Sequence, residues 1–142
     1  MANPRLPQPT EKLAGCIWLP RFIAKVRLHD AGMLDEDYQL AFCHPRGVDG
    51  RFLEHFNLDK DAAIRAIVGS ASDAECEQWF TSLPQVTSGR IDAWNEFAPL
   101  IGRPGHPGER ELAFMLRRIY HGEPPPVALN SSFEAILWDE RE

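Results

Sequence analysis

The sequence lacks long apolar segments and has few cysteines. Its best apolar run, Ala14 to Leu19, is far shorter than the roughly 20 residues that cross a bilayer. The first ten residues have no apolar core of the kind found in a secretory signal. The three cysteines, Cys16, Cys43 and Cys76, share no short spacing, which disfavours a disulfide framework or a zinc site. We therefore expect a cytoplasmic protein, neither secreted nor embedded in a membrane, with no metal and no cofactor.

Positive charge is also scarce. The chain has 15 Lys and Arg against 21 Asp and Glu, and its net charge is -6. Such a field repels phosphate backbones, so we expect no nucleic-acid partner. No phosphate loop, dinucleotide-binding fingerprint, nucleophile elbow or His-Glu-x-x-His pattern occurs. These absences exclude several common enzyme families without excluding catalysis.

Large apolar side chains are abundant. The 142 residues include four Trp and eight Phe, and 44% of the chain is hydrophobic, enough for one ordinary core. The first ten residues carry three prolines and little apolar content. The sequence therefore predicts an extended leader over residues 1–10 and a single compact domain over residues 11–142.

Apolar residues recur at helical spacing in several segments, and no segment favours a strand over a helix. The first predicted helix begins at Leu19 and ends near Gly32. Ser72 and Ser131 are each followed three positions later by Glu, the pattern of a capping box. Further helices are predicted around 51–56, 59–69, 72–83, 91–101, 112–119 and 131–137. We therefore expect an all-α fold of about five to seven helices.

Residues 33–50 break every periodicity. Pro45, Gly47 and Gly50 would each interrupt a helix or a central strand. The segment is therefore predicted to be one long ordered loop, and long loops in compact domains are often functional.

A stripe of positive charge follows the first predicted helix. Arg21 and Lys25 lie roughly opposite the apolar residues Phe22 and Val26 on a helical wheel. The stripe has two interpretations: a solvated face, or a binding site for an anion that also uses Arg27. Arginine offers a planar fork of donors and lysine a point charge, so a carboxylate or a phosphate would suit the second interpretation.

The predicted loop and the residues after it gather reactive side chains. Cys43 or Asp49 could act as a nucleophile or base, and Tyr38 or His55 could move a proton. Cys43 and His44 together are a weak metal pattern, and a packed Cys beside an exposed His is the simpler interpretation.

Three functional hypotheses follow. The first is a helical module that binds a small anion, carboxylate- or phosphate-bearing, or a protein partner. The second is a small cofactor-independent enzyme that acts on a carboxylate-bearing substrate. The third is a domain whose aromatics include an exposed patch for homo-oligomerisation.

One motif near the start of the chain is Leu13-Ala-Gly-Cys-Ile-Trp-Leu-Pro-Arg21, followed by Lys25 and Arg27. Further positions of the same pattern are Tyr38, Cys43, Val48-Asp49, Arg51-Phe52-Leu53, Phe56, and Gly69 to Trp79. On these residues, residues 11–80 resemble a family of short bacterial proteins described as domain of unknown function 5069. The family typically has Asp where this chain has Ala24, and a shorter gap after its Cys, which His44 to Gly47 lengthen here. The resemblance implies a shared fold and no established activity.

Overall fold

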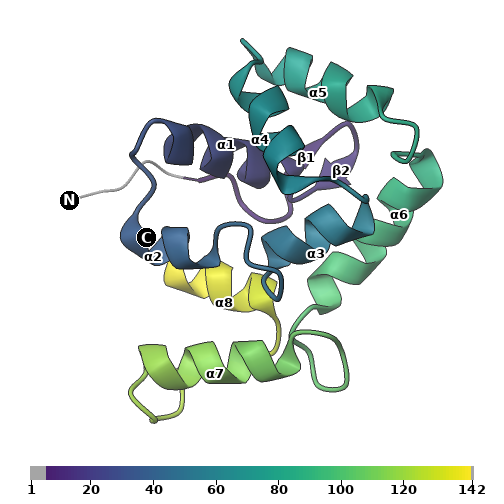
Figure 1. Cartoon of the computed structure of the whole chain (residues 1–142). Helices are drawn as coiled ribbons and strands as arrows, with labels where there is room; N and C mark the ends of the chain where they lie inside the picture. Colours follow the sequence, from purple (N-terminus) through teal and green to yellow (C-terminus); the bar gives the residue numbers. More distant parts are fainter. Residues whose placement is uncertain (1–5, 142) are drawn as a thin grey trace.

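The structure, a computed structural model, describes residues 6–141, and helices dominate it (Figure 1). In chain order the elements are β1 (Lys12–Leu13), β2 (Cys16–Ile17), α1 (Leu19–Asp30), α2 (Glu36–Ala41), α3 (Val48–His55), α4 (Lys60–Val68), α5 (Asp73–Ser82), α6 (Ser88–Phe97), the short 3-10 helix η1 (Ala98–Leu100), α7 (Glu109–Ile119) and α8 (Ser132–Asp139). The predicted all-α class is confirmed. The described residues form eight α-helices, one more than the predicted upper number.

The predicted loop over residues 33–50 is wrong in its centre and at its end. Helix α2 lies inside it, begun by Asp35, whose carboxylate accepts a hydrogen bond from the Asp37 amide at 3.1 Å. Helix α3 starts at Val48, so Gly50 is a helical residue. A Cβ at Gly50 would lie 2.2 Å from the carbonyl oxygen of His44. Glycine is present because the preceding chain passes directly against α3, a reason that local sequence does not reveal.

A β-hairpin whose two strands have two residues each lies near the start of the chain, and it was not predicted. Lys12 pairs with Ile17 and Leu13 with Cys16 in an antiparallel register. The two turn residues, Ala14 and Gly15, have φ angles of 55° and 73°. Positive φ at both central residues is what a tight hairpin of type I′ requires. Strands this short leave no alternating pattern to detect.

The predicted helix starts are confirmed at three serine and aspartate caps. The Ser72 hydroxyl accepts a hydrogen bond from the Glu75 amide, and the Ser131 hydroxyl accepts one from the Glu134 amide. The carboxylate of Asp59 accepts from the Ala62 amide at 2.9 Å and starts α4. These contacts satisfy backbone donors that the first helical turn would otherwise leave free.

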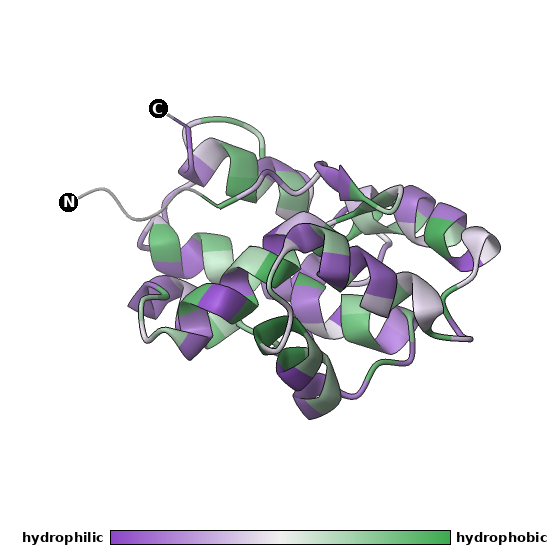
Figure 2. Cartoon of the chain, turned by 90° about the horizontal axis from the view of Figure 1, so that it is seen from above, coloured by the Kyte–Doolittle hydropathy of each residue, from purple (hydrophilic) through white to green (hydrophobic). Residues whose placement is uncertain are grey.

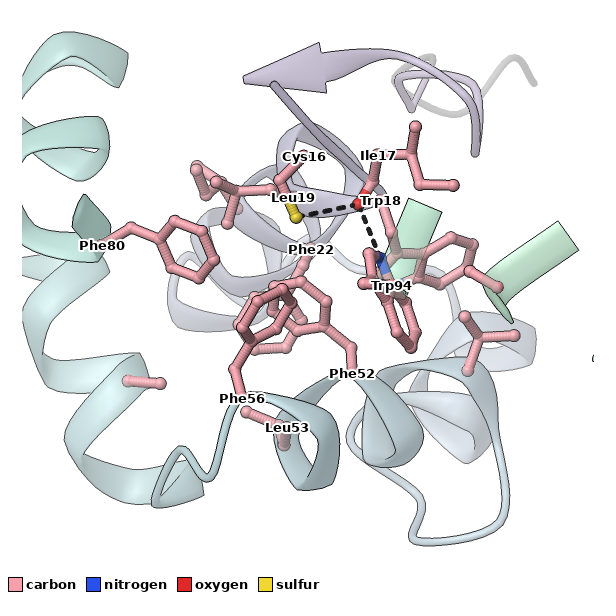
Figure 3. Packing of buried hydrophobic residues seen from close by; sticks show 14 of the residues in the cluster. Cys16, Ile17, Trp18, Leu19, Phe22, Phe52, Leu53, Phe56, Phe80 and Trp94 are labelled. Atoms are coloured by element: carbon pink, nitrogen blue, oxygen red, sulfur yellow. Dashed lines mark hydrogen bonds between the residues drawn. The ribbon is translucent and has the colours of Figure 1, made fainter. Parts of the chain in front are cut away.

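An aromatic cluster forms the core (Figure 3). Phe52 is central, with its ring centroid 5.3 Å from that of Phe22, 5.2 Å from that of Phe56 and 5.4 Å from that of Trp94. The indole nitrogen of Trp94 donates to the Ile17 carbonyl at 2.9 Å, which fastens α6 to the hairpin. Helices from both halves of the chain therefore share one interior, as the spread of aromatics predicted.

The segment before the hairpin packs on the domain. Leu6 and Pro9 are buried, and the Pro9 carbonyl accepts a hydrogen bond from the Trp18 amide at 3.0 Å. Residues 1–5 of the predicted leader lie outside the described residues.

Hydrophilic and hydrophobic residues are mixed along most helices (Figure 2). No helix in residues 6–141 combines the length and the apolar character needed to cross a membrane.

Candidate functional site

Two of the three Lys and Arg side chains of the first helix, α1, are buried. Arg21 is 1% exposed and Lys25 is 4% exposed, one turn apart on α1. The interpretation as a solvated face is therefore wrong for these two residues. Buried charges need partners, because desolvation penalises a lone ion heavily. Each cation here faces one carboxylate.

Lys25 pairs with Asp49, and we call this pair with its hydrogen-bond donors the inner half of the network. The Lys25 ammonium lies 2.7 Å from Asp49 Oδ2, which also accepts the Cys43 amide at 3.1 Å. The Trp18 indole nitrogen donates to Asp49 Oδ1 at 2.8 Å. Both carboxylate oxygens are thus satisfied inside the protein. The arrangement anchors α3 and the segment before it to α1.

The backbone positions these donors through unusual conformations. Trp18 immediately precedes α1 and has a φ of 72°, while Cys43 has a φ of 56°. Left-handed backbone is uncommon for side chains of this kind. Asp49 lies in the first turn of α3, where the helix dipole favours a negative charge.

Arg21 pairs with Glu140, and we call this pair with its contacts the outer half of the network. Nη1 and Nη2 of Arg21 donate to Glu140 Oε1 and Oε2 at 3.0 and 2.5 Å, a two-pronged contact between guanidinium and carboxylate. Nη1 also donates to the Pro7 carbonyl at 3.0 Å. The Tyr38 hydroxyl donates to Glu140 Oε2 at 2.9 Å. These contacts join α1, α2 and the residue that follows α8.

Aromatic rings flank the Arg21 guanidinium. Its central carbon lies 5.4 Å from the ring centroid of Trp18 and 5.8 Å from that of Tyr38. Trp18 in turn stacks on Phe133 of α8 at 5.6 Å. Nε of Arg21 is buried and has no hydrogen-bond partner among the described residues. The rings hold the guanidinium in place while its fork faces the carboxylate.

The network shifts the pKa of two side chains that were predicted to be reactive. Burial, and secondarily the hydrogen bond to Glu140, raises the pKa of Tyr38 to about 12. Burial, and secondarily the Asp49 charge, raises the pKa of Cys43 to about 12. Both groups therefore hold their protons at neutral pH.

The structure brings together five of the residues singled out from the sequence, and two lie elsewhere. The five are Arg21, Lys25, Tyr38, Cys43 and Asp49. Arg27 faces α5 instead, where its guanidinium lies 2.6 Å from the Asp73 carboxylate. His55 faces α6, with Nε2 2.8 Å from the Arg90 carbonyl.

Sequence reasoning missed Trp18 and Glu140 as members of the network. Glu140 lies 119 positions from Arg21, in an acidic segment after the last predicted helix. The one signal for it was negative charge at the carboxyl end of a helix, where the helix dipole disfavours it. Such a placement indicates a partner elsewhere in the fold.

The surface beside the network is hollowed only slightly. An open hollow in the described part of the chain is lined by Leu6, Pro7, Gln8 and Glu11. Pro7 also contacts Arg21, so this hollow adjoins the outer half. Within residues 6–141, no group of three His, Cys, Asp or Glu side chains is arranged to hold a metal ion.

These features define a small helical domain organised around a buried network of two ion pairs. Residues 3–141 match the family model described as Domain of unknown function (DUF5069). The match covers nearly the whole chain, and the protein belongs to this family. The resemblance seen over residues 11–80 is thereby confirmed and extended to the second half of the chain, which includes Glu140. No curated protein matches the chain.

Proposed function

We propose that this protein binds a small ligand through a single carboxylate group at the outer half of the network, where Glu140 holds that position in the unliganded protein. The observation that carries the proposal is the two-pronged contact of a buried Arg21 with a carboxylate that is itself part-exposed. The side chain of Arg21 is 2% exposed and that of Glu140 is 24% exposed. Solvent therefore reaches the anion of the pair and hardly reaches the cation.

The donor set suits a carboxylate. The Arg21 fork supplies two parallel donors and Tyr38 supplies a third from the side. The rings of Trp18 and Tyr38 restrict the guanidinium, so little conformational entropy is lost when it binds an anion. Glu140 would act as an internal stand-in for the ligand.

A singly charged carboxylate fits this site better than a phosphate. Asp139 lies at the end of α8, and its pKa is raised by burial and by the charges of Glu140 and Asp37. Acidic side chains therefore lie close to the site. Glu140 stays attached to the chain when it is displaced, so a bound carboxylate adds one negative charge beside these acids, whereas a doubly charged phosphate adds two.

Displacement of Glu140 requires only a local movement. Glu140 directly follows α8, which ends at Asp139. The last turn of a helix is held by few backbone hydrogen bonds and opens at small free energy. Opening of this turn would expose the Arg21 fork beside the hollow lined by Pro7.

The cytoplasm is the proposed place of action. Cys16, Cys43 and Cys76 are all free thiols. Proteins with unpaired cysteines fit a reducing compartment.

The enzymatic alternative has weaker support. Both oxygens of Asp49 accept hydrogen bonds in a buried setting, and Cys43 keeps its proton at neutral pH. A base needs a free lone pair and a nucleophilic cysteine needs a thiolate. Roles for Cys43, Asp49, Tyr38 and His55 in catalysis stay predictions.

The test is a thermal-shift titration with acetate, benzoate and succinate on the wild type and on Glu140→Gln. Removal of the internal carboxylate should let the external ones bind, so the midpoint should rise with ligand concentration more steeply in the variant. Glu96→Gln on α6, an exposed glutamate far from Arg21 in the chain, is the matched control and should behave like the wild type. Equal titrations in Glu140→Gln and Glu96→Gln would contradict the proposal.

A further inference from the structure

Helix α7 leaves large apolar side chains uncovered. Leu112 is its one buried residue, whereas Phe114 is 55% exposed and Met115 is 52% exposed. The helix lies along the outer edge of the molecule (Figure 1). Scattered exposed apolar residues are ordinary, but neighbouring ones on a single helix need an explanation.

The attachment of α7 fixes which side faces outward. Gly102 sits against Leu112, since a Cβ at Gly102 would lie 3.0 Å from Leu112 Cδ2. Gly108, with a φ of 89°, starts the helix against Ile101. Leu112 therefore points to the body of the protein. At about 100° per residue, Glu111 and Arg118 lie about 100° and 120° around the helix from Leu112, on the same outward flank as Phe114 and Met115. Glu111 is half-buried and Arg118 is exposed.

The residue pattern on the outer face of α7 is self-complementary: it matches a second copy of itself that runs in the opposite direction. Phe114 and Met115 occupy its centre, flanked by Glu111 three positions before and Arg118 three positions after. We call these four residues the α7 face. Reversal of the helix direction exchanges the acid with the base and Phe114 with Met115.

We propose that the α7 face pairs with the α7 face of a second copy of this chain, the two helices running antiparallel about a two-fold axis. The axis would pass between Phe114 and Met115. Glu111 would then meet the partner's Arg118, and Phe114 would meet the partner's Met115. Thioether contacts with aromatic rings are favourable, and a two-fold interface requires this kind of self-complementarity.

The charges of the face are available for such a contact. Glu111 and Arg118 are about 10 Å apart along the helix axis, too far to pair within one chain. Neither forms a salt bridge with another described residue. The Arg118 guanidinium lies 5.9 Å from the ring centroid of Phe114, over the apolar centre of the face.

The size of the face sets the strength of the dimer. One exposed helix face buries less than the roughly 800 Å² per partner of a standard stable interface. The dimer should therefore exchange with the monomer as concentration changes.

The test is sedimentation equilibrium of the full chain over a wide concentration range. The wild type should shift toward dimer as concentration rises. Glu111→Arg and Arg118→Glu should each abolish that shift, because each places like charges opposite one another. The double variant should restore it, because the complementarity is rebuilt with the signs exchanged.

Matched variants separate this effect from a change in folding. Leu40→Lys on α2 alters another exposed side chain and should leave the association unchanged, whereas Met115→Lys should abolish it. Thermal denaturation should give the same midpoint for the charge variants as for the wild type at monomeric concentrations. A wild type that stays monomeric, a dimer that survives both single reversals, or a double variant that does not recover would each overturn the proposal.

Discussion

The inner and outer halves of the network are both ion pairs, but they have different roles. Each pairs a buried cation of α1 with one carboxylate, and the cations are one helical turn apart. The carboxylate of Asp49 is fully buried, whereas Glu140 is 24% exposed. The donors to Asp49 lie 6, 24 and 31 positions away along the chain, whereas Glu140 follows the last helix, 119 positions from Arg21. The accessibility of the anion, more than the strength of the contact, separates an anchor from a site that can exchange its ligand.

The largest expected effect on stability comes from removal of the Asp49 carboxylate. Asp49→Ala would leave the Lys25 charge buried without a partner, and should lower the free energy of unfolding by about 3–5 kcal/mol. Glu140→Ala should lower it by roughly 1.5–3 kcal/mol, because solvent can partly replace that carboxylate. Urea denaturation of both variants measures the difference. Equal losses would remove the distinction between the two halves.

The next effect concerns the segment that brings Cys43 to Asp49. Gly50→Ala places a methyl group against the His44 carbonyl, and overpacking of this kind should destabilise the protein by about 1–3 kcal/mol. Gly89→Ala is the matched control, since Gly89 is helical and has open space around its Cβ position. That change should stabilise α6 by roughly 0.5–1 kcal/mol. Chemical denaturation should give a lower free energy of unfolding for Gly50→Ala and a higher one for Gly89→Ala. An unchanged free energy in Gly50→Ala would contradict the close contact between this segment and α3.

A smaller effect, on pH dependence, belongs to the outer half. The folded pKa of Tyr38 is raised from 10.0 to about 12, so its contribution to stability is complete below pH 10 and is lost as the pH rises toward 12. Ultraviolet titration of the phenol should give the raised value in the wild type. In Glu140→Gln the pKa should fall below that of the wild type but stay above 10, because burial still raises it and only the contribution of the carboxylate is lost. An unchanged value would show that Glu140 does not control Tyr38.

The smallest effect concerns Cys43 in the inner half. A thiol with a pKa of about 12 should react with iodoacetamide more slowly than free cysteine at pH 8, and its rate should keep rising with pH. Cys16 and Cys76 are buried and should stay unmodified in the folded protein, so mass spectrometry can assign the label to Cys43. A rate that levels off near neutral pH would instead favour the catalytic hypothesis.

Local features were predictable from the sequence, and features that join distant segments were not. Ser72, Ser131 and Asp59 lie at helix starts that the sequence predicted, because a cap depends on residues three positions apart. Gly50 wrongly predicted a loop. It is glycine because another segment packs against it, and the local sequence does not show that contact.

The candidate site shows the same difference between local features and features that join distant segments. The charge on Arg21 and Lys25 and the reactive residues of the following segment were visible in the sequence. Their burial was not, because the compensating carboxylates lie 24 and 119 positions away along the chain. Sequence periodicity alone assigns a charged helical stripe to solvent, and only the positions of its partners reverse that assignment.

The exchange of Glu140 for an external carboxylate can be observed directly at Arg21. Nitrogen-15 NMR of the arginine side chains should resolve the Nε signal of Arg21, which has no hydrogen-bond partner within the described residues. On titration of Glu140→Gln with acetate, this signal should move and saturate, whereas the signal of Arg27, paired with Asp73, should stay in place. In the wild type the same acetate concentrations should shift the Arg21 signal far less. An Arg21 signal that is unmoved by acetate in Glu140→Gln would contradict the proposed carboxylate site.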